Sequence, residues 1–184
     1  IEKITSPQGL GLSPRRITVS TAGVAKMIRQ MADEKVRFKL ALSLHSAIES
    51  KRSRLMPINE TNTLADLEAA LDYWYQQTRS RVTLEYVVWE GVNDGEEDVR
   101  ALVRFARKFP SKVNLIEYNS IKNLAEVKIV AKQKKSNDYF MDKMKVNSTT
   151  TIDFISAETM KKTGFISAII FTGILNAQNL QEAH

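Results

Sequence analysis

The sequence predicts an α/β fold built around a parallel β-sheet. Between residues 16 and 118, strand-like segments alternate with helix-like segments. The strand-like segments are nearly continuous apolar runs, which are typical of parallel strands covered on both faces. A helix between two strands carries the chain back across the sheet, so successive strands run in the same direction. This pattern alone leaves both a doubly wound sheet and a barrel open.

The first strand and helix are predicted from "RITVS" (16–20) and "VAKMIRQMADE" (24–34). β-Branched residues dominate the first segment, and a Thr-Ala-Gly turn follows it. In the second segment, apolar side chains recur at helical spacing and predict a stripe that packs in the core rather than a cofactor site. The residues of this stripe are Val24, Met27, Ile28 and Met31.

The second strand is predicted over residues 38–45, "FKLALSLH", and a cationic loop follows it. The loop contains Lys51, Arg52 and Arg54. The next helix is predicted to start at Asn62-Thr63, where Thr63 and Asp66 have the spacing of a capping box. Its predicted buried stripe consists of Leu64, Leu67, Leu71 and Trp74.

The third and fourth strands are predicted over residues 81–89 and 112–118. Acidic residues after the third strand suit the first turn of a helix, where the helix dipole favours negative charge. That helix stops before Pro110, and its stripe consists of Val99, Leu102, Val103 and Ala106. Glu85 and Asn114 are polar residues within the two strands. We expect them to point inward and to be hydrogen-bonded, and the sequence assigns them no chemical role.

Composition limits the classes of function that the chain can have. The 184 residues include no cysteine, which excludes a disulfide, a thiolate nucleophile and a cysteine-bound metal. A chain without cysteine fits a reducing compartment. The net charge of +6 permits a nucleic acid or a phosphorylated partner. The longest apolar stretch, 165–175, is too short for a membrane span, and no glycine-rich phosphate-binding motif is present.

Polar side chains cluster where the predicted strands end. Ser20 and Thr21 follow the first strand, Ser43 and His45 close the second, and Asn119 follows the fourth. The carboxyl ends of neighbouring parallel strands meet at one edge of a sheet, which is where ligands bind in such folds. Hydroxyl, imidazole and amide groups suit hydrogen bonding to a polar cofactor. The alternative is that each group only satisfies local backbone.

Five segments in one order resemble a known family. They are "GLSPRRITVSTAGV" (11–24), "LALSLHSA" (40–47), "RSRLMPIN" (52–59), "VTLEYVVWEGVND" (82–94) and "KVNLIEYN" (112–119). Together they resemble the radical S-adenosylmethionine methyltransferases that methylate carbon 2 of an adenine in 23S rRNA and in tRNA. The resemblance covers about residues 10–121.

The resemblance implies an incomplete (β/α) barrel of the radical S-adenosylmethionine type, with parallel strands. It also implies a cytoplasmic enzyme, with no membrane partner, that acts in rRNA and tRNA processing. Residues at the strand ends would contact S-adenosylmethionine, namely Ser20, Ser43, Leu44, His45 and Asn119. Because the substrate is RNA, basic residues near the strands could contact phosphates. These are Arg15, Arg16, Lys51, Arg52 and Arg54.

The chain departs from this family in its cysteines. The family holds a [4Fe–4S] cluster with a C-x₃-C-x₂-C motif and carries the methyl group on a further cysteine near its carboxyl end. This chain has none, so we expect a fragment that has no turnover alone. An alternative is an RNA- or nucleoside-binding α/β module without chemistry. The sequence leaves the oligomeric state open, and exposed sheet edges predict marginal stability or association.

Three parts are predicted along the chain. Residues 1–15 lead into a partial barrel over 16–121, and residues 122–184 diverge from the family. Within the last part, 138–145 resembles a family helix and 149–155 a strand, whereas the remainder does not match. We hypothesise a shifted reading frame in this part. Translation of the same DNA in its other two frames would restore a cysteine-containing family segment if the hypothesis is correct.

Overall fold

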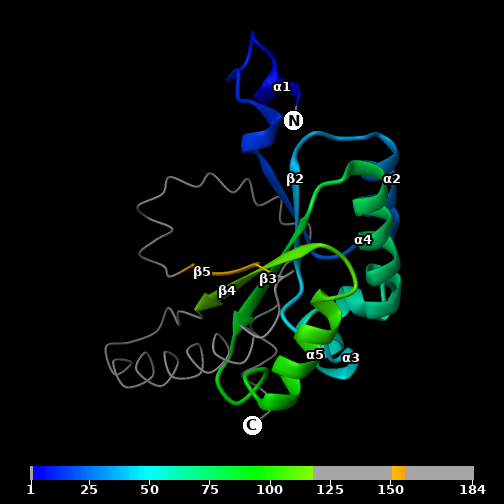
Figure 1. The fold of residues 1–184 in the computed structure, drawn as a ribbon, viewed down its shortest axis with the longest axis vertical. Coiled ribbons are helices and arrows are strands. Elements are labelled where there is room, and N and C mark those ends of the chain that lie inside the picture. The colour runs from blue at the N-terminus through cyan, green and yellow to red at the C-terminus, as the bar shows by residue number, and fades with distance from the viewer. Residues whose placement is uncertain (1, 118–150, 156–184) are drawn as a thin grey trace.

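The fold is a parallel five-stranded sheet, seen in a computed structural model that describes residues 2–117 and 151–155 (Figure 1). The strands follow the order of the sequence, β1-β2-β3-β4-β5, and all four neighbouring pairs are parallel. This confirms the predicted fold class and the strand expected within residues 149–155. The strands are β1 (Thr18–Thr21), β2 (Lys39–Ser43), β3 (Val82–Val88), β4 (Ser111–Glu117) and β5 (Thr151–Ile155).

Three helices, α2, α4 and α5, lie on one side of the sheet (Figure 1). Each connects two successive strands, as a right-handed β-α-β crossover requires. Shorter helices precede β1 and follow β2. The bounds are α1 (Glu2–Thr5), the 3₁₀ helix η1 (Pro14–Arg16), α2 (Ala25–Asp33), α3 (Glu49–Leu55), the 3₁₀ helix η2 (Pro57–Glu60), α4 (Leu64–Thr78) and α5 (Glu96–Ala106).

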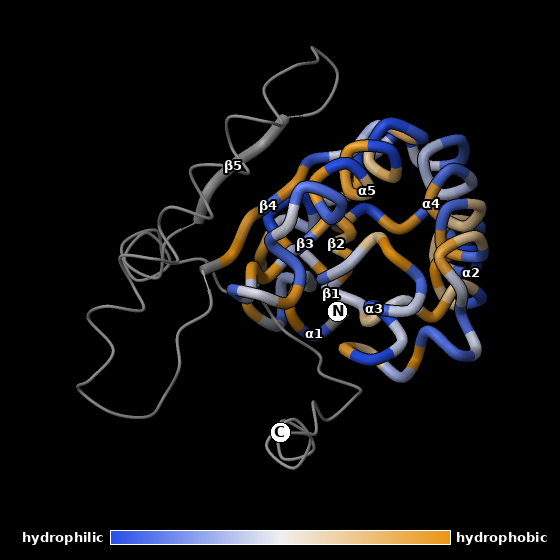
Figure 2. The backbone as a smooth tube through the Cα atoms, turned by 90° about the horizontal axis from the view of Figure 1, so that it is seen from below, coloured by the Kyte–Doolittle hydropathy of each residue, from blue (hydrophilic) through white to orange (hydrophobic). Residues whose placement is uncertain are grey.

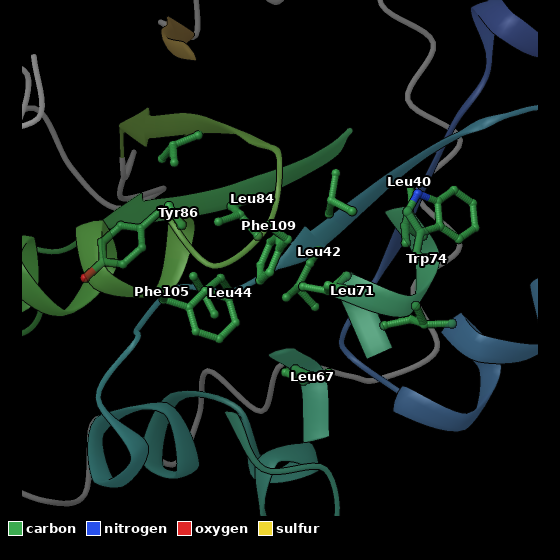
Figure 3. Packing of buried hydrophobic residues seen from close by; sticks show 14 of the residues in the cluster. Leu40, Leu42, Leu44, Leu67, Leu71, Trp74, Leu84, Tyr86, Phe105 and Phe109 are labelled. Carbon is green, nitrogen blue, oxygen red and sulfur yellow. The ribbon is translucent and has the colours of Figure 1, made fainter. Parts of the chain in front are cut away.

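The core lies between the sheet and these helices (Figure 3). Leu84 and Tyr86 of β3 are fully buried in it, whereas Thr83 and Glu85, which alternate with them, are only half-buried. The tube coloured by hydropathy shows apolar and polar residues alternating around the helices α2, α4 and α5 that cover the sheet (Figure 2). The expectation that the strands are apolar on both faces is therefore wrong for β3. Its side chains alternate with period two, as in a strand with one face in the core.

The capping box at the start of α4 is confirmed. The side chain of Thr63 accepts a hydrogen bond from the backbone N–H of Asp66, and the carboxylate of Asp66 accepts one from the backbone N–H of Thr63. The predicted stripe of α4 also packs in the core, with Leu67, Leu71 and Trp74 fully buried. Among the helices that the structure describes, none is long and apolar enough to cross a membrane.

Two predictions about helices are wrong. The segment that contains Lys51, Arg52 and Arg54 is helix α3 rather than a loop. The sequence carried a signal for it, because Glu49 lies in the first turn and the arginines lie in the last, as the helix dipole favours. In α2, Met27 is 45% exposed. Ile28 and Ala32 form the buried face of α2, which packs on α4.

Candidate functional site

Four polar side chains occupy one face of the sheet, the face opposite the buried leucines of β2 and β3. In the strand register, Ser43 pairs with Glu85 and Glu85 pairs with Asn114. Ser20 pairs with Ala41, two residues before Ser43, so its side chain points to the same face. We call Ser20, Ser43, Glu85 and Asn114 the polar row. It brings together two residues predicted for the cofactor and two that had no assigned role.

A hydrogen bond connects β1 to β3 within the polar row. The Ser20 hydroxyl donates to Oε2 of Glu85, across 65 residues of sequence. Next to Glu85, Asn114 is 9% exposed, and its Oδ1 atom is buried without a hydrogen-bond partner among the residues that the structure describes. Buried polar atoms are nearly always paired, so this oxygen marks a place where a further donor would fit.

His45 lies at the end of β2 and extends the hydrogen bonding between β2 and β3. Its backbone is left-handed, with φ 55°. The backbone N–H groups of Leu44 and His45 both donate to the carbonyl of Glu85, at 2.9 and 3.3 Å. The imidazole Nδ1 then accepts the N–H of Val87 at 3.2 Å. The side chain thus acts as an acceptor where the main chain has turned away from the strand.

The imidazole of His45 is uncharged at neutral pH. Burial, and to a lesser extent the positive charge of Arg52, lower the pKa of His45 from 6.5 to about 4. Because Nδ1 accepts a hydrogen bond, the single proton of the ring is on Nε2. His45 can therefore offer one donor to a ligand but is a poor base at pH 7. Its ring also makes an edge contact with Trp89, at 5.8 Å between ring centroids.

Asn93 was not singled out by the sequence, and it holds the turn after β3 against His45. Its amide Nδ2 donates to the carbonyls of His45 and Val87, at 2.7 and 2.8 Å. Its Oδ1 accepts the N–H of Trp89 at 2.7 Å. Asn93 is fully buried, so these three bonds satisfy its amide. The signal available in the sequence was an Asn within a turn that follows a strand.

Arg52 is buried, which corrects the expectation that it contacts RNA. Its side chain is 0% exposed. The guanidinium donates to the carbonyl of Ala22 at 2.9 Å, to the carbonyl of Ser43 at 3.4 Å and to Oδ1 of Asn59 at 2.7 Å. Burial lowers the pKa of Arg52 to about 10, and the side chain stays charged at neutral pH. Arg52 therefore joins the ends of β1 and β2 to α3 and the 3₁₀ helix η2.

The other basic residues do not form one surface. Lys51 makes an ion pair with the buried Asp98 of α5, at 2.7 Å. Arg54 is exposed on α3, near the carboxyl ends of the strands, whereas Arg15 and Arg16 are exposed before β1, at the amino ends. These positions lie at opposite ends of the strands. Of the five basic residues, only Arg54 is both exposed and close to the carboxyl ends of the strands.

Two further residues, Leu44 and Asn119, were predicted to contact the cofactor. The side chain of Leu44 is fully buried in the core, so only its backbone could meet a ligand. Asn119 lies outside the described residues. Within the described part of the chain, no group of three histidine, aspartate or glutamate side chains could hold a metal ion.

Comparison with known proteins connects this site to one group of enzymes. The chain is 60% identical over 121 residues to the probable dual-specificity RNA methyltransferase RlmN of Christiangramia forsetii. It is 44% identical over 120 residues to the dual-specificity RNA methyltransferase RlmN of Parvibaculum lavamentivorans. The matches cover 66% and 65% of this chain but only 34% and 30% of the relatives, so the chain spans about a third of their length. No model of a protein family matches the chain.

The structure agrees with these sequence matches. It resembles the crystal structure of a radical SAM methyltransferase from Sphaerobacter thermophilus, with a TM-score of 0.68 and 29% identity. The match covers 82% of this chain and 44% of that one, which agrees with a partial (β/α) barrel. These likenesses favour the methyltransferase interpretation over the alternative of a non-catalytic RNA- or nucleoside-binding module. Over about two thirds of its length the chain is thus similar to one part of the RlmN dual-specificity RNA methyltransferases, and its fold is similar to that of a radical SAM methyltransferase.

Proposed function

We propose that this chain is the part of an RNA adenine C2-methyltransferase that holds the nucleoside portion of S-adenosylmethionine. The observation that carries the proposal is the polar row, because Ser20 and Ser43 lie on one face of adjacent strands. Leu44 and His45 would complete the site at the end of β2, and Asn119, which lies outside the described residues, remains a proposed contact on the basis of the sequence. For His45, the N–H at Nε2 is the group available to a ligand, since Nδ1 is already bonded.

The residues of this chain fit S-adenosylmethionine but not the iron–sulfur cluster of the family. The ribose and the amino group of the cofactor carry hydrogen-bond donors, and the polar row offers acceptors for them. A [4Fe–4S] cluster requires thiolate ligands, and the chain contains no cysteine. The methyl-carrying cysteine is absent for the same reason. We therefore propose binding of the cofactor without turnover by this chain alone.

The substrates that we propose for the whole enzyme are 23S rRNA and tRNA, in the cytoplasm. The names of the relatives and the net charge of +6 support an RNA partner. Of the basic residues discussed above, Arg54 is the best candidate for a phosphate contact, because it is exposed near the strand ends. The three-part division at residues 15 and 121 also remains our proposal.

Calorimetric titration of the full chain with S-adenosylhomocysteine tests the proposal. This ligand keeps the nucleoside and the amino acid of the cofactor but has no methyl group to transfer. We expect measurable binding, and a loss of about tenfold in affinity for Ser20→Ala, because one hydrogen bond is removed. The matched control is Ser50→Ala, an exposed serine on α3, which should leave the affinity unchanged. Equal affinities for all three chains would contradict the assignment of Ser20.

A further inference from the structure

We propose that Glu85 and Asn114, together with Ser20, form a subsite for a ligand group that presents at least two hydrogen-bond donors. The inference rests on the proposed function, since it concerns the same cofactor. It adds two residues of the central strands to the proposed site. It also states that the protein accepts hydrogen bonds there and that the ligand donates them. Three arguments support it, one for each side chain.

The first argument concerns Ser20, whose hydroxyl has a single proton. That proton is donated to Glu85. The oxygen of Ser20 keeps its lone pairs, so it can meet a ligand only as an acceptor. If the serine instead faced a ligand acceptor, it would have to give up its bond to a carboxylate, which is among the stronger hydrogen bonds in proteins.

The second argument concerns Glu85, which lies in the middle of β3 and is half-buried. A carboxylate has two oxygens and accepts several hydrogen bonds, and Ser20 supplies one at Oε2. The register places Ser43 on one side of Glu85 and Asn114 on the other. The carboxylate is thus the central acceptor of the row.

The third argument concerns Asn114, whose amide oxygen lacks a hydrogen-bond partner. Asn114 is 9% exposed, and its Oδ1 atom is buried. Within the described part of the chain, no hydrogen-bond donor reaches this oxygen. Such an atom costs folding free energy unless a donor reaches it. A ligand that binds on this face would supply that donor, so the unpaired oxygen marks a position kept for the ligand.

Three parts of the cofactor carry donors of this kind. They are the vicinal hydroxyls of the ribose, the exocyclic amino group of the adenine and the ammonium of the amino acid. Their shared chemistry is a compact group with two or more donors, which matches adjacent acceptors on neighbouring strands. Smaller ligands distinguish them: 5′-methylthioadenosine has the hydroxyls and the adenine amino group, 5′-methylthioinosine has the hydroxyls without that amino group, and methionine has the ammonium.

The experiment is calorimetric titration of the full chain and of two variants with S-adenosylhomocysteine. Glu85→Gln replaces acceptors by an amide of the same shape, and we expect the affinity to fall by about tenfold or more. The matched control is Glu97→Gln, which removes an exposed charge on α5 and should leave the affinity unchanged. Titration with the three smaller ligands then shows which of them lose affinity through Glu85→Gln.

Asn114→Leu separates ligand binding from a structural role. Replacement of an unpaired buried oxygen by an apolar group of similar size should leave the melting temperature unchanged or raise it, whereas the affinity should fall. A lower melting temperature with unchanged affinity would overturn the inference. Binding that neither variant weakens would overturn it as well and would leave the proposed function standing. If the unsubstituted chain does not bind S-adenosylhomocysteine, both are wrong.

Discussion

His45 shows how a single residue can serve the fold and limit the chemistry of a site. Its left-handed backbone ends β2, and its Nδ1 atom replaces the strand carbonyl that Val87 would otherwise use. This arrangement requires a neutral ring, because a protonated imidazole has no acceptor. The lowered pKa of His45 follows from the same burial. A structural role for Nδ1 therefore leaves only Nε2 for a ligand.

The pKa of His45 predicts how the stability of the protein depends on pH. In the unfolded chain the imidazole titrates near 6.5, whereas in the folded chain it titrates at about 4. Between these values the unfolded state binds more protons, so the free energy of unfolding rises with pH. Stability should be complete above pH 6.5 and should fall by roughly 3 kcal/mol as the pH drops to 4.

Urea unfolding of the full chain between pH 4 and 7.5 measures this dependence. The matched variant is His45→Asn, because Asn tolerates the left-handed backbone and does not titrate. The difference between the two chains isolates the contribution of His45 from that of the carboxylates. If the free energy of unfolding changed with pH in the same way for both chains, the imidazole would not be held neutral by the fold.

At the scale of elements, α3 anchors the strand ends that carry the site. Arg52 of α3 donates to backbone carbonyls that follow β1 and close β2. On the same helix, Lys51 pairs with Asp98 of α5. The ends of two strands and the start of a distant helix are thus tied to one short helix. Two of its three basic residues, Lys51 and Arg52, thus have their partners inside the molecule.

Loss of this anchor should be costly. Arg52→Met fills a similar volume but leaves the carbonyls of Ala22 and Ser43 and the amide oxygen of Asn59 without their donor. We expect the free energy of unfolding to fall by about 2–4 kcal/mol. Urea unfolding followed by circular dichroism measures it.

Arg54→Met is the matched control for Arg52→Met, on the same helix. Arg54 is exposed, so this change should alter stability by no more than about 0.5 kcal/mol. If both variants lost a similar amount of unfolding free energy, the hydrogen bonds of Arg52 would contribute little to stability beyond the effect of its charge.

At the scale of the molecule, the sheet has two outer strands. Among the described strands, β1 and β5 each pair on one side only. Unpaired strand edges offer backbone donors and acceptors to a second chain. The relatives are about three times as long as the matched region, so in them more chain is available to cover such a sheet.

We therefore expect this chain in isolation to associate or to be marginally stable. Sedimentation velocity over a range of protein concentrations should show species larger than the monomer, and the melting temperature should rise with concentration. A monomer with a sharp melting transition that does not depend on concentration would contradict this expectation. Such a result would indicate that the sheet edges are already protected.

Much of the fold could be predicted because it depends on local chemistry. The capping box of α4 requires only Thr63 and Asp66, three residues apart. The buried stripe of α4 follows from helical spacing in the same way. Met27 shows the limit of such reasoning. Its spacing matched the stripe, but Met27 is exposed, and the fully buried residues of α2 are Ile28 and Ala32.

The sequence by itself determined the parallel α/β class, the alternation of strands and helices along the chain and the polar residues at the strand ends, because periodicity and turn chemistry act over a few residues. Only the tertiary structure decided that Ser20 meets Glu85, that Asn114 lies beside it and that Arg52 is buried. These contacts depend on the register between strands that are distant in the sequence and on how the helices pack. No local pattern specifies either of them.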